Sequence, residues 1–190
     1  RERLQQGFGG AGQGWLEIKP VTQKLSWRVF PDENWKRYTL FGSKDSTIKH
    51  KKFGPGLTIF RFAEPVNDSV FNDTLIDKAS FRLKNSYQGY AKCNSWSSAK
   101  MYYGNLNSKV RLEVRNKDDE IIKSDTLMPV EDISSVILSG DYKDEFSVKL
   151  SGYDSPDIYG VSLESSNGII VDNLPLRGNA GTVFTLAERL

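Results

Sequence analysis

The run Lys109-Val-Arg-Leu-Glu-Val-Arg115 decides the fold class, because its charged and apolar residues alternate strictly. Strict alternation predicts a β-strand with one face packed and the other in water. The next four residues, Asn116-Lys-Asp-Asp119, predict a hairpin loop, and Glu120–Asp125 predicts the returning strand. The same period of two recurs in Glu145–Leu150.

Seven more short runs have strand character, and Gly, Asn, Asp, Ser and Pro separate them. Helical periodicity is nearly absent between Gly7 and Leu176. Short strands that recur roughly every 8–12 residues are typical of sandwiches. We therefore expect an all-β fold, an antiparallel jelly-roll-like β-sandwich with short helical pieces at both termini. The seven runs are Lys36–Phe41, Leu57–Phe62, Ala79–Leu83, Lys100–Tyr103, Ser134–Leu138, Tyr159–Glu164 and Ile169–Asn173.

The two ends differ from the middle. Residues 1–14 predict the tail of a helix followed by a Gly-rich loop, and residues 168–190 predict a strand, a turn and the start of a helix. The sandwich is expected over residues 15–167. A unit whose ends lie inside elements of another architecture predicts a piece of a larger protein.

The length and the charge balance of the chain exclude several classes of protein. The chain has 190 residues, with 26 Lys and Arg against 24 Asp and Glu, a net charge of +2. This balance predicts no broad basic face, so we expect neither nucleic acid nor an anionic membrane as the main partner. No apolar stretch approaches the roughly 20 residues of a membrane span.

Catalytic and metal-binding groups are scarce. His50 is the only histidine and lies in a basic loop, where we expect it to be exposed; Cys93 is the only cysteine and is expected to be small and buried. One His and one Cys exclude the usual zinc clusters. Turn acids such as Asp154 and Asp157 fit Ca²⁺, but solvated turns are favoured. We expect no metal and no cofactor.

The Gly-rich stretch Gly7–Gly12 matches the spacing G-x-G-x-x-G. A dinucleotide site needs these glycines between a strand and a helix. Here they follow a helix and precede strand-like Trp15–Ile18, so a helix cap and a turn are favoured.

Aromatic rings and amide groups gather in one segment, Tyr87–Ser98. Rings stack on the apolar faces of sugars, while amides and hydroxyls bind sugar hydroxyl groups. The segment therefore predicts a glycan-binding site at the end of the sandwich. The alternative is that these rings close the core. The predicted ligand-binding residues are Trp96, Tyr87, Tyr90 and Asn94.

Both ends resemble one family. Arg1–Trp15, with its Phe-Gly-Gly-Ala-Gly loop, resembles the stretch after the nucleophile block of SGNH (GDSL-type) hydrolases that carry an inserted β-sandwich, a group similar to bacterial glycan O-acetylesterases of the lipase/acylhydrolase type. Gly160-Val-Ser-Leu-Glu164 and Val171–Thr182 resemble the strand of re-entry and the second hydrolase block.

The resemblance implies oxyanion-hole donors. The second block supplies a glycine N–H to the charged oxygen of the transition state, which places this role at Gly181, with Gly178 as the alternative. The Gly-Asp-Ser nucleophile block and the Asp-x-x-His block are absent from these 190 residues. We therefore expect this chain alone to be inactive as an esterase.

Two classes of function stay open. In the first, the chain is the non-catalytic, carbohydrate-binding-like part of a secreted, periplasmic or cell-surface esterase, with acetylated glycan and the rest of the hydrolase as partners. In the second, it is a free-standing sandwich for protein–protein or surface interaction.

Overall fold

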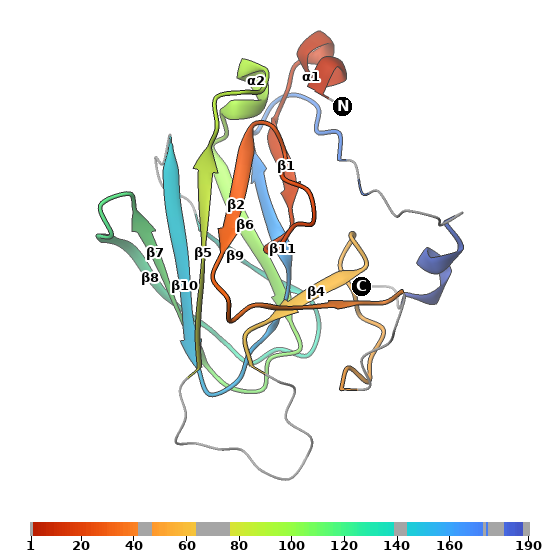
Figure 1. The fold of residues 1–190 in the computed structure, drawn as a ribbon, viewed down its shortest axis with the longest axis vertical. Helices are drawn as coiled ribbons and strands as arrows, with labels where there is room; N and C mark the ends of the chain where they lie inside the picture. Colours follow the sequence, from red (N-terminus) through yellow and green to blue (C-terminus); the bar gives the residue numbers. More distant parts are fainter. Residues whose placement is uncertain are drawn as a thin grey trace.

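Two antiparallel sheets form the molecule. The computed structural model describes residues 2–41, 47–63, 77–138, 144–172, 174 and 181–187. Every strand pair within the two sheets is antiparallel. Figure 1 shows one sheet on the side of β1 and β11 and the other on the side of β7, β8 and β10. The predicted all-β, antiparallel sandwich is confirmed.

The six-stranded sheet has the order β3-β4-β11-β6-β9, with β1 added beside β11. Its strands are β1 (Gly12–Leu16), β3 (Lys36–Thr39), β4 (Thr58–Arg61), β6 (Ser98–Gly104), β9 (Ser134–Ile137) and β11 (Asp157–Glu164).

The five-stranded sheet has the order β2-β5-β10-β7-β8. Its strands are β2 (Trp27–Pro31), β5 (Asp77–Asn85), β7 (Val110–Asn116), β8 (Ile121–Leu127) and β10 (Glu145–Gly152). The described helices are short: α1 (Glu2–Phe8), α2 (Ala91–Asn94) and the 3₁₀-helix Thr182–Leu186.

Alternation along the strands builds the main core between the sheets. On β10, buried and partly exposed residues alternate over the whole strand. Val148 lies opposite Phe81 of β5 and Val114 of β7, and none of these three side chains is more than 1% exposed. The period of two read from the sequence therefore marks the core-facing side chains.

A second, smaller core lies on the outer face of the six-stranded sheet. It contains Trp15, Ile59 and Tyr159, whereas Phe60 and Ile158, one position away along the strands, belong to the main core. Successive residues of a strand point to opposite faces, so the two cores lie on opposite sides of this sheet.

The prediction from the sequence lacked two elements of the structure and included one strand that does not form. Strand β2 and helix α2 were not predicted. The expected strand Ile169–Asn173 is wrong for the described residues, because Ile169 makes only an isolated parallel bridge with Gly10. The helix predicted near residue 183 is the 3₁₀-helix Thr182–Leu186, while the N-terminal helix is confirmed as α1.

The six-stranded sheet splits at β11. β6 pairs along one edge of β11; on the other edge, β1 pairs with Val161–Glu164 and β4 pairs at Ile158. Gly160 lies between these two pairings, and a Cβ atom there would come within 2.7 Å of the Leu16 carbonyl oxygen. Beyond this close approach β1 and β4 separate, and Figure 1 shows them running in different directions. The candidate site lies at this split.

Candidate functional site

A pocket of about 530 Å³ opens where β1 and β4 part. It is lined by Trp15–Glu17 at the end of β1, by the segment that leads to β2, by Arg37 and Phe41 near β3, and by Gly56 just before β4. Ligand pockets typically measure about 300–1,000 Å³ and combine apolar walls with a few polar groups. The volume and the lining of this pocket fit that description.

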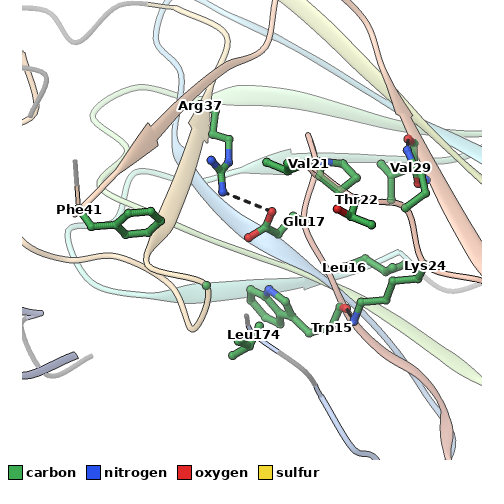
Figure 2. A pocket seen from close by; sticks show the side chains of 13 residues that line it. Trp15, Leu16, Glu17, Val21, Thr22, Lys24, Val29, Arg37, Phe41 and Leu174 are labelled. Atoms are coloured by element: carbon green, nitrogen blue, oxygen red, sulfur yellow. Dashed lines mark hydrogen bonds and ion pairs between the residues drawn. The ribbon is translucent and has the colours of Figure 1, made fainter. Parts of the chain in front are cut away.

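Trp15 forms a fixed aromatic wall. Its ring is 9% exposed and packs against Tyr102, with 5.5 Å between the ring centroids. On the other side, a Cβ atom at Gly160 would lie 2.6 Å from Trp15 Cζ2, so the ring occupies space that only glycine leaves free. The half-buried ring of Phe41 lies across the pocket in Figure 2.

An acid and a base face each other between these rings. Glu17 Oε2 and an Arg37 guanidinium nitrogen are 3.7 Å apart (Figure 2). Glu17 also accepts a hydrogen bond from Thr58 Oγ1 at 3.2 Å. A Cβ atom at Gly56 would lie 2.7 Å from Glu17 Oε1, so this glycine leaves room for the carboxylate. The pocket thus presents a hydrogen-bond acceptor beside a donor.

Two buried donors in the pocket have no acceptor among the described residues. These atoms are Trp15 Nε1 and Arg37 Nε. Buried polar groups are nearly always hydrogen-bonded, and leaving one unsatisfied costs about 1–3 kcal/mol. Both atoms are almost completely covered by protein, so the polar groups open to a ligand in the pocket are the partly exposed ends of the Glu17 and Arg37 side chains.

The C-terminal flank fixes the position of Trp15. Asp172 Oδ1 accepts a hydrogen bond from Trp15 N at 2.9 Å and lies 3.5 Å from Lys24 Nζ. Gly14 has φ +72°, and a Cβ atom there would lie 2.7 Å from the Asp172 carboxylate. The backbone before Trp15 therefore needs glycine for two reasons, its left-handed conformation and the close carboxylate.

The predicted ligand-binding residues lie on one stretch around α2, outside the residues that line the pocket. Tyr87 is 66% exposed and has φ +56°. Its hydroxyl donates to Asp144, and this hydrogen bond raises the pKa of Tyr87. Tyr90 is partly buried at the start of α2.

The other two predicted residues also contact the protein interior. Asn94 Nδ2 donates to the Gly89 carbonyl at 3.4 Å, and the Asn94 carbonyl accepts from Trp27 Nε1 at 3.0 Å. The partly buried Trp96 ring lies 5.7 Å from the rings of both Trp27 and Phe146. Their role in glycan binding stays a prediction.

The predicted oxyanion donors lie near the C-terminus. Gly181 has φ +87° and precedes the 3₁₀-helix, and its carbonyl accepts from Phe184 N at 3.2 Å. No atom lies within 4 Å of a Cβ atom built at Gly181. Gly178 lies outside the described residues. The oxyanion role stays a prediction for both glycines.

The expectation that His50 is exposed is wrong. Its side chain is 22% exposed, and Nε2 lies 2.9 Å from Asp157 Oδ2. Arg61 binds the same aspartate at 2.6 Å and Asp154 at 3.1 Å, and all three of these charged residues are at most 2% exposed. His50 thus belongs to a buried ion cluster, which also explains why Asp154 and Asp157 are not solvated turn acids.

The expectation for the single cysteine can be checked directly. Cys93 is fully buried, as predicted. Among the described residues there is no group of three or more His, Cys, Asp or Glu side chains placed to hold a metal ion. In the same part of the chain, no helix has the length and the apolar character that a membrane crossing requires.

Comparisons with known proteins assign the chain to no family. No family model matches the chain, and no curated protein matches it. One similar solved structure is described as TmCBM61 in complex with beta-1,4-galactotriose. It is 14% identical, with a TM-score of 0.37, over 79% of this chain and 91% of that chain. The SGNH resemblance therefore rests on the terminal motifs alone.

Proposed function

We propose that this chain is a non-catalytic carbohydrate-binding β-sandwich and that the pocket at the split of the sheet holds the sugar. The observation that carries the proposal is the placement of Glu17 and Arg37, 3.7 Å apart, between the rings of Trp15 and Phe41. A sugar hydroxyl both donates and accepts, so neighbouring hydroxyls bind a carboxylate and a guanidinium at once. The apolar face of the same sugar ring packs on an aromatic wall.

The charges of the pocket favour a neutral sugar. Arg37 faces Glu17, and Lys24 lies beside Asp172, so positive and negative groups balance. An acidic sugar bound to Arg37 would place its carboxylate next to Glu17, and this like-charge contact opposes binding. A neutral sugar places its hydroxyl oxygens beside the partly exposed Arg37 guanidinium without that repulsion.

Calorimetric titration with a panel of neutral oligosaccharides tests this proposal. The informative variant is Glu17→Gln, which keeps the shape of the side chain and removes its charge. We expect at least tenfold weaker binding, since a hydrogen bond to a charged group contributes about 1.5–3 kcal/mol. Asp118→Asn, an exposed acid in the hairpin loop, is the matched control. Equal affinity of Glu17→Gln and the wild-type chain would reject the pocket.

The predicted segment around α2 is the competing site within the same proposal. Tyr87 is its most exposed ring, so Tyr87→Ala removes the side chain most available to a sugar at small cost in stability. If the pocket is the site, Tyr87→Ala binds as tightly as the wild-type chain. Loss of binding in Tyr87→Ala with full binding in Glu17→Gln moves the site to Tyr87, Tyr90, Asn94 and Trp96.

We further propose that the sandwich is an insertion in an SGNH-type esterase that acts on acetylated glycans outside the cytoplasm. The flanks that carry the hydrolase-like motifs lie side by side: Gly10 bridges Ile169, and Gln5 Nε2 donates to the carbonyls of Gly12 at 3.0 Å and Ile169 at 3.1 Å. A domain inserted into a loop of another fold needs its two connections close together. This adjacency supports the insertion.

Assay of the chain with an activated acetyl ester tests the catalytic part of this proposal. We expect no turnover above the blank, because an oxyanion donor without a nucleophile and a base has no reaction to accelerate. Turnover that a Ser or His50 substitution abolishes would overturn the non-catalytic role. A gene region without Gly-Asp-Ser shortly upstream would favour the alternative, a free-standing interaction module.

A further inference from the structure

The outer face of the five-stranded sheet gathers positive charge. The side chains that alternate with the buried positions of β2, β5, β10 and β7 point outward, and seven of them are cations while two are carboxylates. The whole chain has a net charge of only +2, so the total charge does not indicate that cations gather on this face. The expectation of no broad basic face is wrong here. The cations are Arg28, Lys78, Arg82, Lys84, Arg111, Arg115 and Lys149; the carboxylates are Glu113 and Glu145.

One pair on this face opposes folding. Arg28 of β2 lies directly opposite Lys84 of β5 in the sheet register. Like charges that face each other across two strands destabilise a sheet. Arg28 Nη2 donates to Gln88 Oε1 at 2.8 Å, and this neutral partner does not compensate the charge of the guanidinium. An anionic ligand on this face would offset the repulsion between Arg28 and Lys84.

The carboxylates leave cations available for a ligand. Glu145 lies 3.2 Å from both Arg82 and Lys84, and Glu113 binds Arg111 and Arg115 at 2.7 Å and 2.6 Å. A third carboxylate, Asp119 of the hairpin loop, lies 3.0 Å from Lys149 and 3.2 Å from Arg115. Three carboxylates thus serve five of the seven cations, and the face keeps an excess of positive charge. These pairs hold the long side chains extended across the sheet surface.

The face also carries groups that suit a sugar. Serines alternate with the cations, for example Ser147 between Arg82 and Arg115 in one row across the sheet. Phe30 is 40% exposed, and the Arg82 guanidinium lies 5.1 Å from its ring centroid. Hydroxyls and an exposed ring contact sugar units, whereas the cations contact the charged groups of the ligand.

The spacing of the cations favours a polysaccharide over duplex nucleic acid. Residues two apart on a strand are about 6.6–6.8 Å apart, and neighbouring strands are about 4.8 Å apart. Duplex DNA carries one charge per about 1.7 Å of its axis, and proteins bind it by dense phosphate neutralisation. A polymer whose charges are several ångströms apart matches a face where serines and carboxylates separate the cations.

We propose that this face, hereafter the basic sheet face, binds a linear polysaccharide that bears carboxylate groups. Arg28, Lys84 and Lys149 contact the carboxylates of the ligand, and the serines bind its hydroxyls. Lys84 and Lys149 share their charge between the ligand and their partners Glu145 and Asp119. The basic sheet face shares no residue with the pocket, which lies on the six-stranded sheet's side of the molecule. The proposal therefore stands or falls independently of the neutral-sugar site.

The test is binding of the full chain to polygalacturonate at two salt concentrations, with the fully methyl-esterified polymer as the neutral comparison. We expect binding to the acidic polymer that weakens as salt rises, and no binding of the basic sheet face to the ester. The double variant Arg28→Gln/Lys84→Gln should bind at least tenfold more weakly, while its melting temperature stays equal or rises. Lys51→Gln/Lys100→Gln removes the same charge elsewhere and should bind like the wild-type chain.

Three outcomes would overturn the proposal. These are unchanged binding in Arg28→Gln/Lys84→Gln, equal weakening in Lys51→Gln/Lys100→Gln, and tighter binding of a duplex DNA than of polygalacturonate at the same salt concentration. If the double variant unfolds, the single variant Lys149→Gln replaces it, because this partly exposed lysine lies on β10, the central strand of the sheet. Lys149→Gln should then weaken binding at least threefold, and unchanged binding would reject the proposal.

Discussion

The Trp15 ring lies directly over Gly160, in the space that any side chain at position 160 would fill. A Cβ atom there would come 2.6 Å from Trp15 Cζ2 and 2.7 Å from the Leu16 carbonyl oxygen. The glycine lies on β11 between the pairings with β1 and β4, so one residue sets both the split of the sheet and the aromatic wall of the pocket.

Gly160→Ala should therefore damage stability and binding together. The added methyl group must displace the Trp15 ring and the backbone of β1, and overpacking of this kind costs about 1–3 kcal/mol. Chemical denaturation and sugar titration measure the two effects. Gly7→Ala adds the same methyl group where no atom lies within 4 Å, and it should leave binding unchanged without lowering stability, since alanine favours a helix such as α1. Wild-type binding in Gly160→Ala would show that the position of Trp15 is not needed.

Phe41→Ala tests the second ring of the pocket. Phe41 is half-buried, so we expect a moderate loss of stability and at least fivefold weaker binding of a neutral sugar. Aromatic contacts contribute about 0.5–1.5 kcal/mol beyond area burial, which sets the size of the binding effect. Phe8→Ala, which removes a 71% exposed ring from α1, should leave binding as it is. Equal binding in both variants would place the sugar away from Phe41.

Trp96→Ala separates packing from recognition. The ring packs against Trp27 and Phe146, so its loss should destabilise the chain by about 2–4 kcal/mol, toward the lower end of Trp→Ala costs because Trp96 is only partly buried. Tyr87→Ala, on the same stretch but 66% exposed, should cost less than about 1 kcal/mol. Similar melting temperatures for the two variants would contradict the packing role.

Asp157→Asn tests the buried ion cluster. The substitution leaves the Arg61 guanidinium with Asp154 as its remaining carboxylate partner, and breaking a buried pair costs about 3–5 kcal/mol. We expect a large fall in the free energy of unfolding. Asp118→Asn, an exposed change of the same chemistry, should alter that free energy by less than about 0.5 kcal/mol. A stable Asp157→Asn variant would show that the cluster does not hold this end of the sandwich together.

Acid should remove the stability that the Glu113 carboxylate contributes to the fold. The hydrogen bond from Arg115 lowers the pKa of Glu113, so the contribution of this carboxylate to stability is present above its unfolded-state pKa and is lost as pH falls through its lower folded-state pKa. NMR titration of the Glu113 carboxyl group should show this low pKa in the wild-type chain and a higher one in Arg115→Gln. An identical titration in both chains would contradict the assigned cause.

The strands were predictable because alternation is a local signal. Glu145–Leu150 and Lys109–Arg115 reveal their buried faces without any knowledge of their partners. β2 was not predicted from the sequence because its five residues end on Pro31, and proline disfavours a strand. Ile169–Asn173 has strand composition, but within the described residues it has only Gly10 to pair with.

The pocket and the basic sheet face depend on long-range pairing. Trp15 and Glu17 are two residues apart, which predicts a shared face, but Arg37 and Gly56 join them only through the order of β3, β4 and β11. The pairing of Arg28 with Lys84 likewise requires the register between β2 and β5. Total charge averages over both sides of the molecule and cannot reveal such a face.

The most direct test of the sugar pocket follows the indole N–H signals of the four tryptophans during titration with a neutral oligosaccharide. The Trp27 and Trp35 indoles donate to backbone carbonyls away from the pocket, whereas Trp15 is a residue that lines it. Binding in the pocket predicts that the Trp15 signal, assigned through Trp15→Phe, moves farthest and saturates with the binding curve. A saturating shift of Trp96 with an unmoved Trp15 signal would contradict this account and place the sugar at the segment around α2.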